Sequence, residues 1–245
     1  MFGEVASFAT EGSALNADWV ALRKELEFLK GCQVRYFILS VTATGAVVGF
    51  AQKVSAGMPD PVLYLAPLLV TLPCWWIFFD KSTTISRIVG YVRVLEDLRR
   101  TGRTDPHQYL GWENALEIFR SDHPPLLKRI TLWCREWVKG LLGGLWALLL
   151  LTTHKYWALN YWTFAGLSAA SLWMASPLRT QNRWMWLVFV AISGFSAVYN
   201  LGVLGRLTIG SASYRTNYAK WNTVLDQVAP SLSHDTLSTL VSLPR

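Results

Sequence analysis

Charged residues are scarce in this sequence. They make up 16% of its 245 residues, whereas a soluble domain carries roughly 25%. Hydrophobic residues make up 52% and occur in long blocks. A helix of about 20 mostly apolar residues crosses the roughly 30 Å of hydrocarbon in a bilayer. The composition therefore argues against an ordinary soluble domain and predicts an integral membrane protein.

Cysteine is rare, and catalytic motifs are missing. The three cysteines, Cys32, Cys74 and Cys134, lie far apart, without a CxxC pair or a histidine cluster beside them. Neither a disulfide framework nor a zinc site is predicted. The sequence has no GxxxxGK[ST], GxGxxG, HExxH or GxSxG motif, and its four histidines are scattered. We therefore expect no enzyme and no cofactor.

Five apolar blocks set the expected topology. They cover residues 36–51, 62–79, 140–153, 156–176 and 184–205. The block at 140–153 is too short to span a bilayer unless its helix begins earlier, near Leu126. The sequence predicts an all-α polytopic membrane protein with four or five transmembrane helices and a helical cytoplasmic segment.

These blocks divide the chain into five parts. We expect a cytoplasmic N-terminal amphipathic helix at 1–35, a first transmembrane hairpin at 36–79, a basic helical cytoplasmic segment at 80–139, a second transmembrane region of two or three helices at 140–205, and a C-terminal helical tail at 206–245. Loops rich in Lys and Arg stay in the cytoplasm. This rule places the N-terminus in the cytoplasm of a multi-pass protein of the cell inner membrane. Five spans would leave the tail outside and four inside; its Arg206, Arg215 and Lys220 favour the inside.

Both ends of the chain carry an apolar stripe with spacings of four and three residues. The stripes are Leu15, Trp19, Leu22, Leu26 and Leu29 near the start, and Tyr214, Tyr218, Trp221, Leu225 and Val228 in the tail. This spacing is typical of a coiled-coil seam. It is equally typical of an amphipathic helix that lies on the membrane or packs on its own chain, so both interpretations stay open.

The first apolar block contains candidates for pore lining or helix packing. Ser40, Thr44, Gly45 and Gly49 lie there. The two hydroxyls, one turn apart, would either line a narrow wet path or bond to their own backbone. Gly45-x-x-x-Gly49 is a spacing that lets membrane helices approach closely, as is Gly140-x-x-x-Gly144. No block has a charged residue in its middle, apart from the ambiguous Lys155, which argues against an ion-coupled transporter.

The basic segment contains the candidate ligand site. Its first helix carries an apolar stripe, and its arginines project elsewhere: Arg87, Arg93, Arg99, Arg100 and Arg103. Guanidinium groups bind phosphate groups well. They also bind anionic lipid headgroups at the membrane surface. The pattern therefore predicts either a phosphate-bearing ligand or a lipid contact.

The run WWIFFDKSTTISRIVGYVRVLEDL, from Trp75 to Leu98, is the most distinctive stretch. With the layout of two spans, a basic middle and two or three more spans, it resembles small multi-pass membrane effectors of bacterial anti-phage defence operons, in particular the Hailong-type effectors. The resemblance is mostly architectural and carries over no residue roles. It implies an oligomeric channel whose partner enzyme makes a nucleic-acid signal.

Together these features lead to one expected function and one alternative. We expect a homo-oligomeric membrane channel or pore-forming effector, gated from the cytoplasm by a nucleotide or oligonucleotide. Its partners would be the lipid bilayer, further copies of the chain, the signal and the enzyme that makes it. The alternative is a non-conducting membrane anchor or assembly protein whose basic segment binds a partner protein or anionic lipid.

Overall fold

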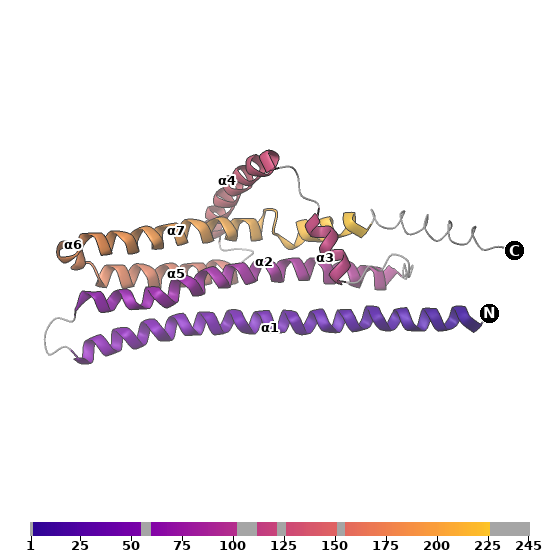
Figure 1. The fold of residues 1–245 in the computed structure, drawn as a ribbon, viewed down its shortest axis with the longest axis horizontal. Helices are drawn as coiled ribbons and strands as arrows, with labels where there is room; N and C mark the ends of the chain where they lie inside the picture. The colour runs from indigo at the N-terminus through magenta and orange to yellow at the C-terminus, as the bar shows by residue number, and fades with distance from the viewer. Residues whose placement is uncertain (1, 55–59, 102–111, 122–125, 151–154, 226–245) are drawn as a thin grey trace. The chain divides into compact units, whose positions relative to one another are not determined.

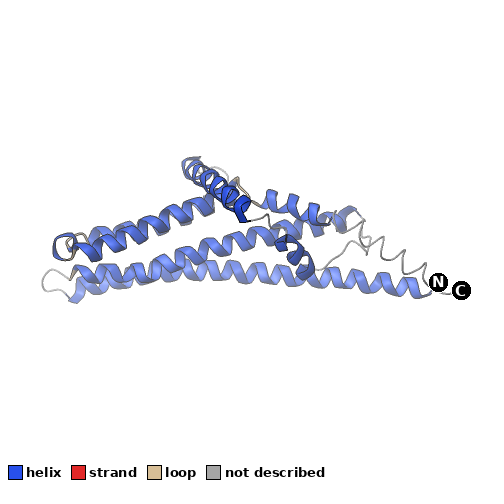
Figure 2. Ribbon diagram, turned by 45° about the horizontal axis from the view of Figure 1, so that its top comes forward, coloured by secondary structure: helices blue, strands red, loops and turns tan. Residues whose placement is uncertain are grey.

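The computed structural model describes residues 2–54, 60–101, 112–121, 126–150 and 155–225. Over these residues all regular structure is helical (Figure 1). The elements are α1 (Phe2–Val54), a short 3-10 helix η1 (Pro61–Leu65), α2 (Ala66–Thr101), α3 (Trp112–Ser121), α4 (Leu126–Leu150), α5 (Lys155–Met174), α6 (Leu178–Gln181) and α7 (Arg183–Thr208). A further helical segment covers residues 214–225. The expected all-helical fold is confirmed for the described residues (Figure 2).

Three stretches of helix are long and apolar enough to cross a membrane. They are Asn16–Ala51, Pro61–Asp97 and Arg183–Thr208. The expected first and second spans lie inside these longer helices, because α1 begins well before its apolar block and α2 continues well beyond its own. The helix of the third block begins at Leu126, the start that a span there would need. These lengths are compatible with a membrane protein.

The chain divides into two compact units, each described here by itself. Unit 1 comprises Met1–Phe28, Ile85–Trp133 and Ala212–Arg245, and unit 2 comprises Leu29–Thr84 and Cys134–Ser211. Both units are assembled from segments that lie far apart in the sequence. Helices α1 and α2 contribute to both units.

Side-chain caps fix the helix starts in unit 2. The Asp60 carboxylate accepts a hydrogen bond from the Val62 backbone N–H at 2.9 Å, and Pro61 follows it at the first helical position. Proline suits that position because its missing N–H would be unpaired there anyway. The Asn182 side chain accepts from the Met185 N–H at 3.3 Å and caps α7. With the short α6 before it, this cap reverses the chain, so that α5 and α7 lie antiparallel side by side (Figure 1).

Aromatic side chains form the centre of unit 2. The Trp75 ring of α2 stacks on Phe164 of α5, with centroids 6.0 Å apart, and meets Tyr161 edge-on at 5.3 Å. Phe78, one turn further along α2, also contacts Phe164, at 5.6 Å. Trp75, Phe78 and Phe164 are fully buried. Such rings bury large apolar areas and prefer stacked or edge-on geometry, so this cluster joins α2 to α5.

Glycines bring α4 against the end of α7. A Cβ at Gly205 would overlap the backbone of Gly140 and of Gly144, and a Cβ at Gly144 would overlap the Leu201 carbonyl oxygen. The predicted Gly140-x-x-x-Gly144 motif thus packs within the chain. Close backbone approach of this kind is the reason that small residues gather at membrane helix contacts.

The core of unit 1 is a group of four aromatic side chains. Trp221 lies 4.9 Å from Tyr91, 5.6 Å from Trp112 and 4.3 Å from Phe119, centroid to centroid. The Trp221 indole N–H donates to the Arg87 carbonyl oxygen at 3.1 Å. Asp18 of α1 accepts from the Trp112 backbone N–H at 3.2 Å. Trp221 and Leu22, from the two predicted stripes, are therefore buried within their own chain.

We predict that Gly205→Ala destabilises the protein, because the added methyl group meets the backbone of α4. Overpacking of this kind costs about 1–3 kcal/mol. Gly194→Ala on the same helix is the control, since nothing lies within 4 Å of a Cβ there and alanine is the better helix former. Thermal unfolding in detergent would measure both variants. An unchanged melting temperature for Gly205→Ala would contradict the described packing.

Candidate functional site

Two groups of cations lie over aromatic rings in unit 1. In the first, the Arg93 guanidinium carbon lies 4.9 Å from the Tyr214 ring centroid, and that of Arg215 lies 5.8 Å from it. The Arg215 Nε donates to the Tyr214 hydroxyl at 3.1 Å. Tyr214 is partly exposed, and Arg93 and Arg215 are exposed. Two guanidinium groups from distant parts of the sequence thus meet at one accessible ring.

The second group surrounds Phe119 of α3. The Lys220 ammonium lies 4.0 Å from the Phe119 ring centroid and donates to the Phe119 carbonyl oxygen at 3.2 Å. The Arg87 guanidinium carbon lies 5.7 Å from the same ring. Phe119 stacks on the buried Trp221. The aromatic core of unit 1 therefore supports the cations at its surface.

The positive charges around Tyr214 affect the ionisation of the Tyr214 hydroxyl group. The hydrogen bond from Arg215 lowers the pKa of the Tyr214 hydroxyl, and the charges of Arg215 and Arg93 lower it further. A positively charged surface with accessible aromatic rings suits phosphate groups and stacked bases together. The two groups, Arg93, Tyr214 and Arg215 on the one hand and Phe119 and Lys220 on the other, are together called the cation–aromatic surface below.

The five predicted arginines have different positions. Arg93 belongs to the cation–aromatic surface, and Arg87 turns onto Phe119 at its edge. Arg100 is exposed on α2. The Arg99 side chain and Arg103 lie outside the described residues. From the sequence, Arg215 and Lys220 indicated only the side of the membrane on which the tail lies, because no local pattern connects them to Arg93 or Phe119.

The candidates in α1 behave in two ways. The Ser40 hydroxyl donates to the Tyr36 carbonyl oxygen at 2.9 Å and that of Thr44 to Ser40 at 2.8 Å. Both hydroxyls are buried and bond to their own helix. Gly45 and Gly49 are exposed, with no atom within 4 Å of a Cβ at either position. Within the described chain the Gly45-x-x-x-Gly49 face of α1 is therefore open.

A row of buried polar side chains runs along both α5 and α7 in unit 2. Asn160, Ser168 and Ser171 lie on one face of α5, and Ser193, Ser196 and Asn200 lie on one face of α7. Spacings of three, four and seven or eight residues keep each set on a single side of its helix. The Tyr161 hydroxyl donates to the Ala197 carbonyl oxygen at 3.1 Å and fixes the register of the two helices. We call these six side chains the polar row.

Part of the polar row has no hydrogen-bond partner among the described residues. Ser196 and Asn160 donate to carbonyl oxygens one turn earlier in their own helices. The hydroxyl oxygens of Ser168, Ser171 and Ser193 and the side-chain oxygen of Asn200 find no such partner. A buried polar atom without a partner costs about 1–3 kcal/mol. These oxygens are therefore suited to accept water or to ligate a small cation.

Among the described residues, no group of three or more His, Cys, Asp or Glu side chains is arranged to hold a metal ion. The cation–aromatic surface and the polar row are two sites whose chemistry the described residues do offer. Neither was evident from the sequence as a unit, although most of its members lie on predicted helices.

We predict that Arg93→Ala and Arg215→Ala each weaken binding of a short single-stranded oligonucleotide to the full-length protein. Each phosphate contact contributes roughly 0.7 to the slope of log affinity against log salt for single strands, so each variant should flatten the slope by about that amount. Fluorescence anisotropy over a salt series would measure it. Arg183→Ala is the matched control, because Arg183 is an exposed arginine of unit 2. Equal slopes for all three variants would contradict the prediction.

Comparison with known proteins gives no relative for this chain. No family model, no curated protein and no solved structure matches it. The site described above therefore rests on its geometry and chemistry alone.

Proposed function

We propose that this protein is a homo-oligomeric membrane channel or pore-forming effector, gated from the cytoplasm by a nucleotide or oligonucleotide signal in anti-phage defence. The observation that carries the proposal is the polar row, which is buried on α5 and α7 while the outside of unit 2 is apolar. Trp173 and Trp184, for example, are 78% and 80% exposed. Large exposed apolar surface with polar groups inside is the distribution expected in lipid.

We infer four spans: the three long apolar stretches in α1, α2 and α7, and α5, a 20-residue helix that lies antiparallel to α7. In unit 2, α2 and α7 run in the same direction (Figures 1 and 2). Helix α5 and the part of α1 that belongs to this unit run in the opposite direction. An even number of passes returns the tail to the side of the N-terminus. Helix α4 meets α7 through residues in the last third of α7, such as Gly202 and Gly205, which suits a helix at the membrane surface. This arrangement favours four spans over five and a cytoplasmic tail.

The polar row supplies oxygen atoms along the apolar part of the protein. Serine hydroxyls and an amide oxygen can replace part of the water shell of a monovalent cation without carrying charge themselves. No Asp, Glu, Lys or Arg occurs among residues 156–176 of α5 and its following turn, so a passing cation meets no fixed charge there. These features favour a narrow conducting path over ion-coupled transport.

Self-association is supported by the open face of α1. Gly45 and Gly49 are exposed, and the neighbouring Ile38, Leu39 and Val41 are exposed apolar residues. A helix from a second copy of the chain would pack against these two glycines, in the same way that α4 packs closely against α7 within one chain. We therefore assign the contact between copies to this face of α1.

Gating is assigned to the cation–aromatic surface. A phosphate-bearing signal would bind Arg93 and Arg215 and stack on Tyr214. Helix α2 carries Arg93 and also carries Trp75 in the core of unit 2. A displacement of its basic end is thus passed along a single helix to the apolar bundle, a common route for coupling two sites.

Single-channel recording from the purified full-length protein in planar bilayers tests the proposal. We expect discrete currents that respond to short oligonucleotides on the side of Arg93 and Arg215, and loss of that response when Arg93 and Arg215, which meet at Tyr214, become Glu. Ser168→Val with Ser171→Val should lower the unitary conductance severalfold, because two oxygens are replaced by methyl groups. Thr163→Val is the control, since the Thr163 hydroxyl bonds to the Leu159 carbonyl of its own helix.

A silent bilayer, with protein that is folded and oligomeric, would overturn the channel proposal. It would favour the alternative of a non-conducting membrane anchor or assembly protein whose basic segment binds a partner protein or anionic lipid. An unchanged unitary conductance in the variant that combines Ser168→Val with Ser171→Val would instead indicate that the polar row does not line the conducting path.

A further inference from the structure

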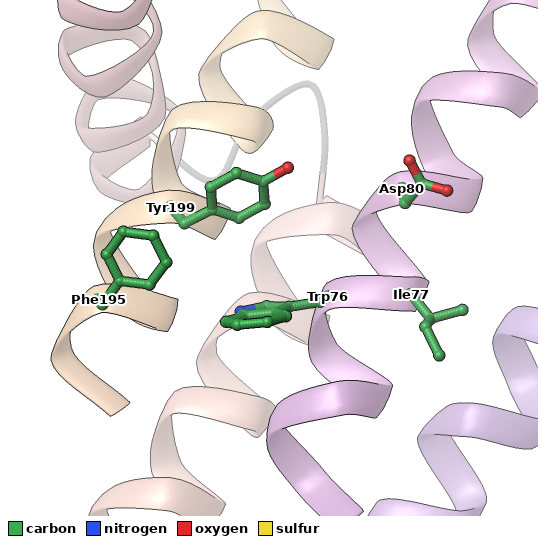
Figure 3. Close-up of a pocket in the computed structure, with 5 residues that line it drawn as sticks. All are labelled: Trp76, Ile77, Asp80, Phe195 and Tyr199. Carbon is green, nitrogen blue, oxygen red and sulfur yellow. The ribbon is translucent and has the colours of Figure 1, made fainter. Parts of the chain in front are cut away.

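A groove on unit 2 lies between α2 and α7, and it combines aromatic rings with a carboxylate. It is lined by Trp76, Ile77 and Asp80 of α2 and by Phe195 and Tyr199 of α7, with a volume of about 430 Å³ (Figure 3). We propose that this groove binds the ammonium headgroup of a zwitterionic phospholipid. The inference depends on the membrane location of unit 2 but not on conduction.

Three aromatic rings form one side of the groove. Trp76 lies 6.2 Å from Phe195 and 6.3 Å from Tyr199, and Phe195 lies 6.2 Å from Tyr199, centroid to centroid. Figure 3 shows the Trp76 ring pointing from α2 toward the two rings of α7. Trp76 and Phe195 are 40% and 62% exposed, so ring surface remains available. Aromatic faces attract ammonium groups through the ring quadrupole, and Trp does so most strongly.

Asp80 supplies the charge that an ammonium group needs. It is the charged member of the described lining and lies one helical turn after Trp76 on α2. Its side chain is exposed, and none of the ion pairs among the described residues involves it. The Tyr199 hydroxyl points toward the α2 side of the groove (Figure 3) and offers a donor for a phosphate oxygen. The groove is thus complementary to a headgroup with a cation and a phosphate.

The surface beyond the groove is suited to acyl chains. Leu69 precedes Trp76 on α2 by two turns, and Val188 precedes Phe195 on α7 by the same distance; both are exposed. Because α2 and α7 run in the same direction, Leu69 and Val188 lie at a similar level, about 10 Å from the aromatic rings. Ile192 continues the apolar surface on α7. A lipid with its headgroup at Asp80 would lay its chains along these residues toward the middle of the bilayer.

The depth of the groove agrees with a headgroup position. The apolar block of α2 ends at Phe79, and Asp80 and Lys81 follow it. Tryptophan gathers at this level of a membrane, where its ring lies partly in lipid and partly in water. A free organic cation would need only the rings and the carboxylate. The apolar continuation along Leu69, Val188 and Ile192 selects a lipid as the occupant.

Native mass spectrometry of the full-length protein, equilibrated with equal amounts of phosphatidylethanolamine and phosphatidylglycerol of identical acyl chains, tests the inference. We expect the wild-type protein to retain the ammonium lipid in about threefold to tenfold excess. Asp80→Asn and Trp76→Leu should bring that ratio close to one. Glu27→Gln and Trp173→Leu are the matched controls, because they remove an exposed carboxylate and an exposed indole that do not line the groove.

Equal retention of the two lipids by the wild-type protein would overturn the inference, as would equal ratios in Asp80→Asn and Glu27→Gln. Ethanolamine in its ammonium form serves as a competitor that lacks both the phosphate and the acyl chains. Its binding without retention of phosphatidylethanolamine would assign the groove to a soluble cation and overturn the lipid assignment. The amount of retained lipid is measured independently of any channel current. A negative result in this experiment therefore leaves the channel proposal intact. Silent bilayers with a normal lipid ratio would overturn the channel alone.

Discussion

The structure of unit 2 depends on the need of every polar group inside an apolar coat to find a partner. Ser40, Thr44 and Ser196 meet this need within their own helices. Gln33 meets it between helices, since its amide donates to Ser82 and to the Phe78 carbonyl. Where the surroundings contain no water, no water molecule competes with these hydrogen bonds for their donors and acceptors. The oxygens of Ser168, Ser171 and Ser193 and the amide oxygen of Asn200 are among the buried polar atoms that find no partner in the described residues, and they are the ones that lie together in the polar row.

Unit 1 follows the opposite principle. Its aromatic side chains are inside, around Trp221, and its cations lie over the outer rings. A guanidinium or ammonium held over a ring is restricted before any ligand arrives, so less side-chain freedom is lost on binding. The two units therefore divide the work that the proposed function needs. One presents an ordered positive surface, and the other presents an apolar exterior with oxygen atoms inside.

The helices could be predicted from the sequence, whereas the contacts between distant segments could not. The period of apolar residues is a local property, and it predicted the all-helical fold; the start of α4 at Leu126 is the one that a span at 140–153 would need. The ends of the spans were less predictable, because α1 has no proline or cap at residue 35 to stop it. The meeting of Arg93 with Tyr214, or of Trp76 with Phe195, joins residues more than 100 positions apart. A single sequence carries no signal for such pairs.

The burial of Trp221 in unit 1 has a consequence for the order of synthesis. Its indole fills the space between Tyr91, Trp112 and Phe119, and it comes from the last described helical segment. A ribosome releases the apolar helices α1, α2, α5 and α7 before it releases that residue. The aromatic core, and with it the positive surface, is therefore completed only after these four helices have been synthesised. A chain terminated before Trp221 would carry the apolar helices without the aromatic core of unit 1.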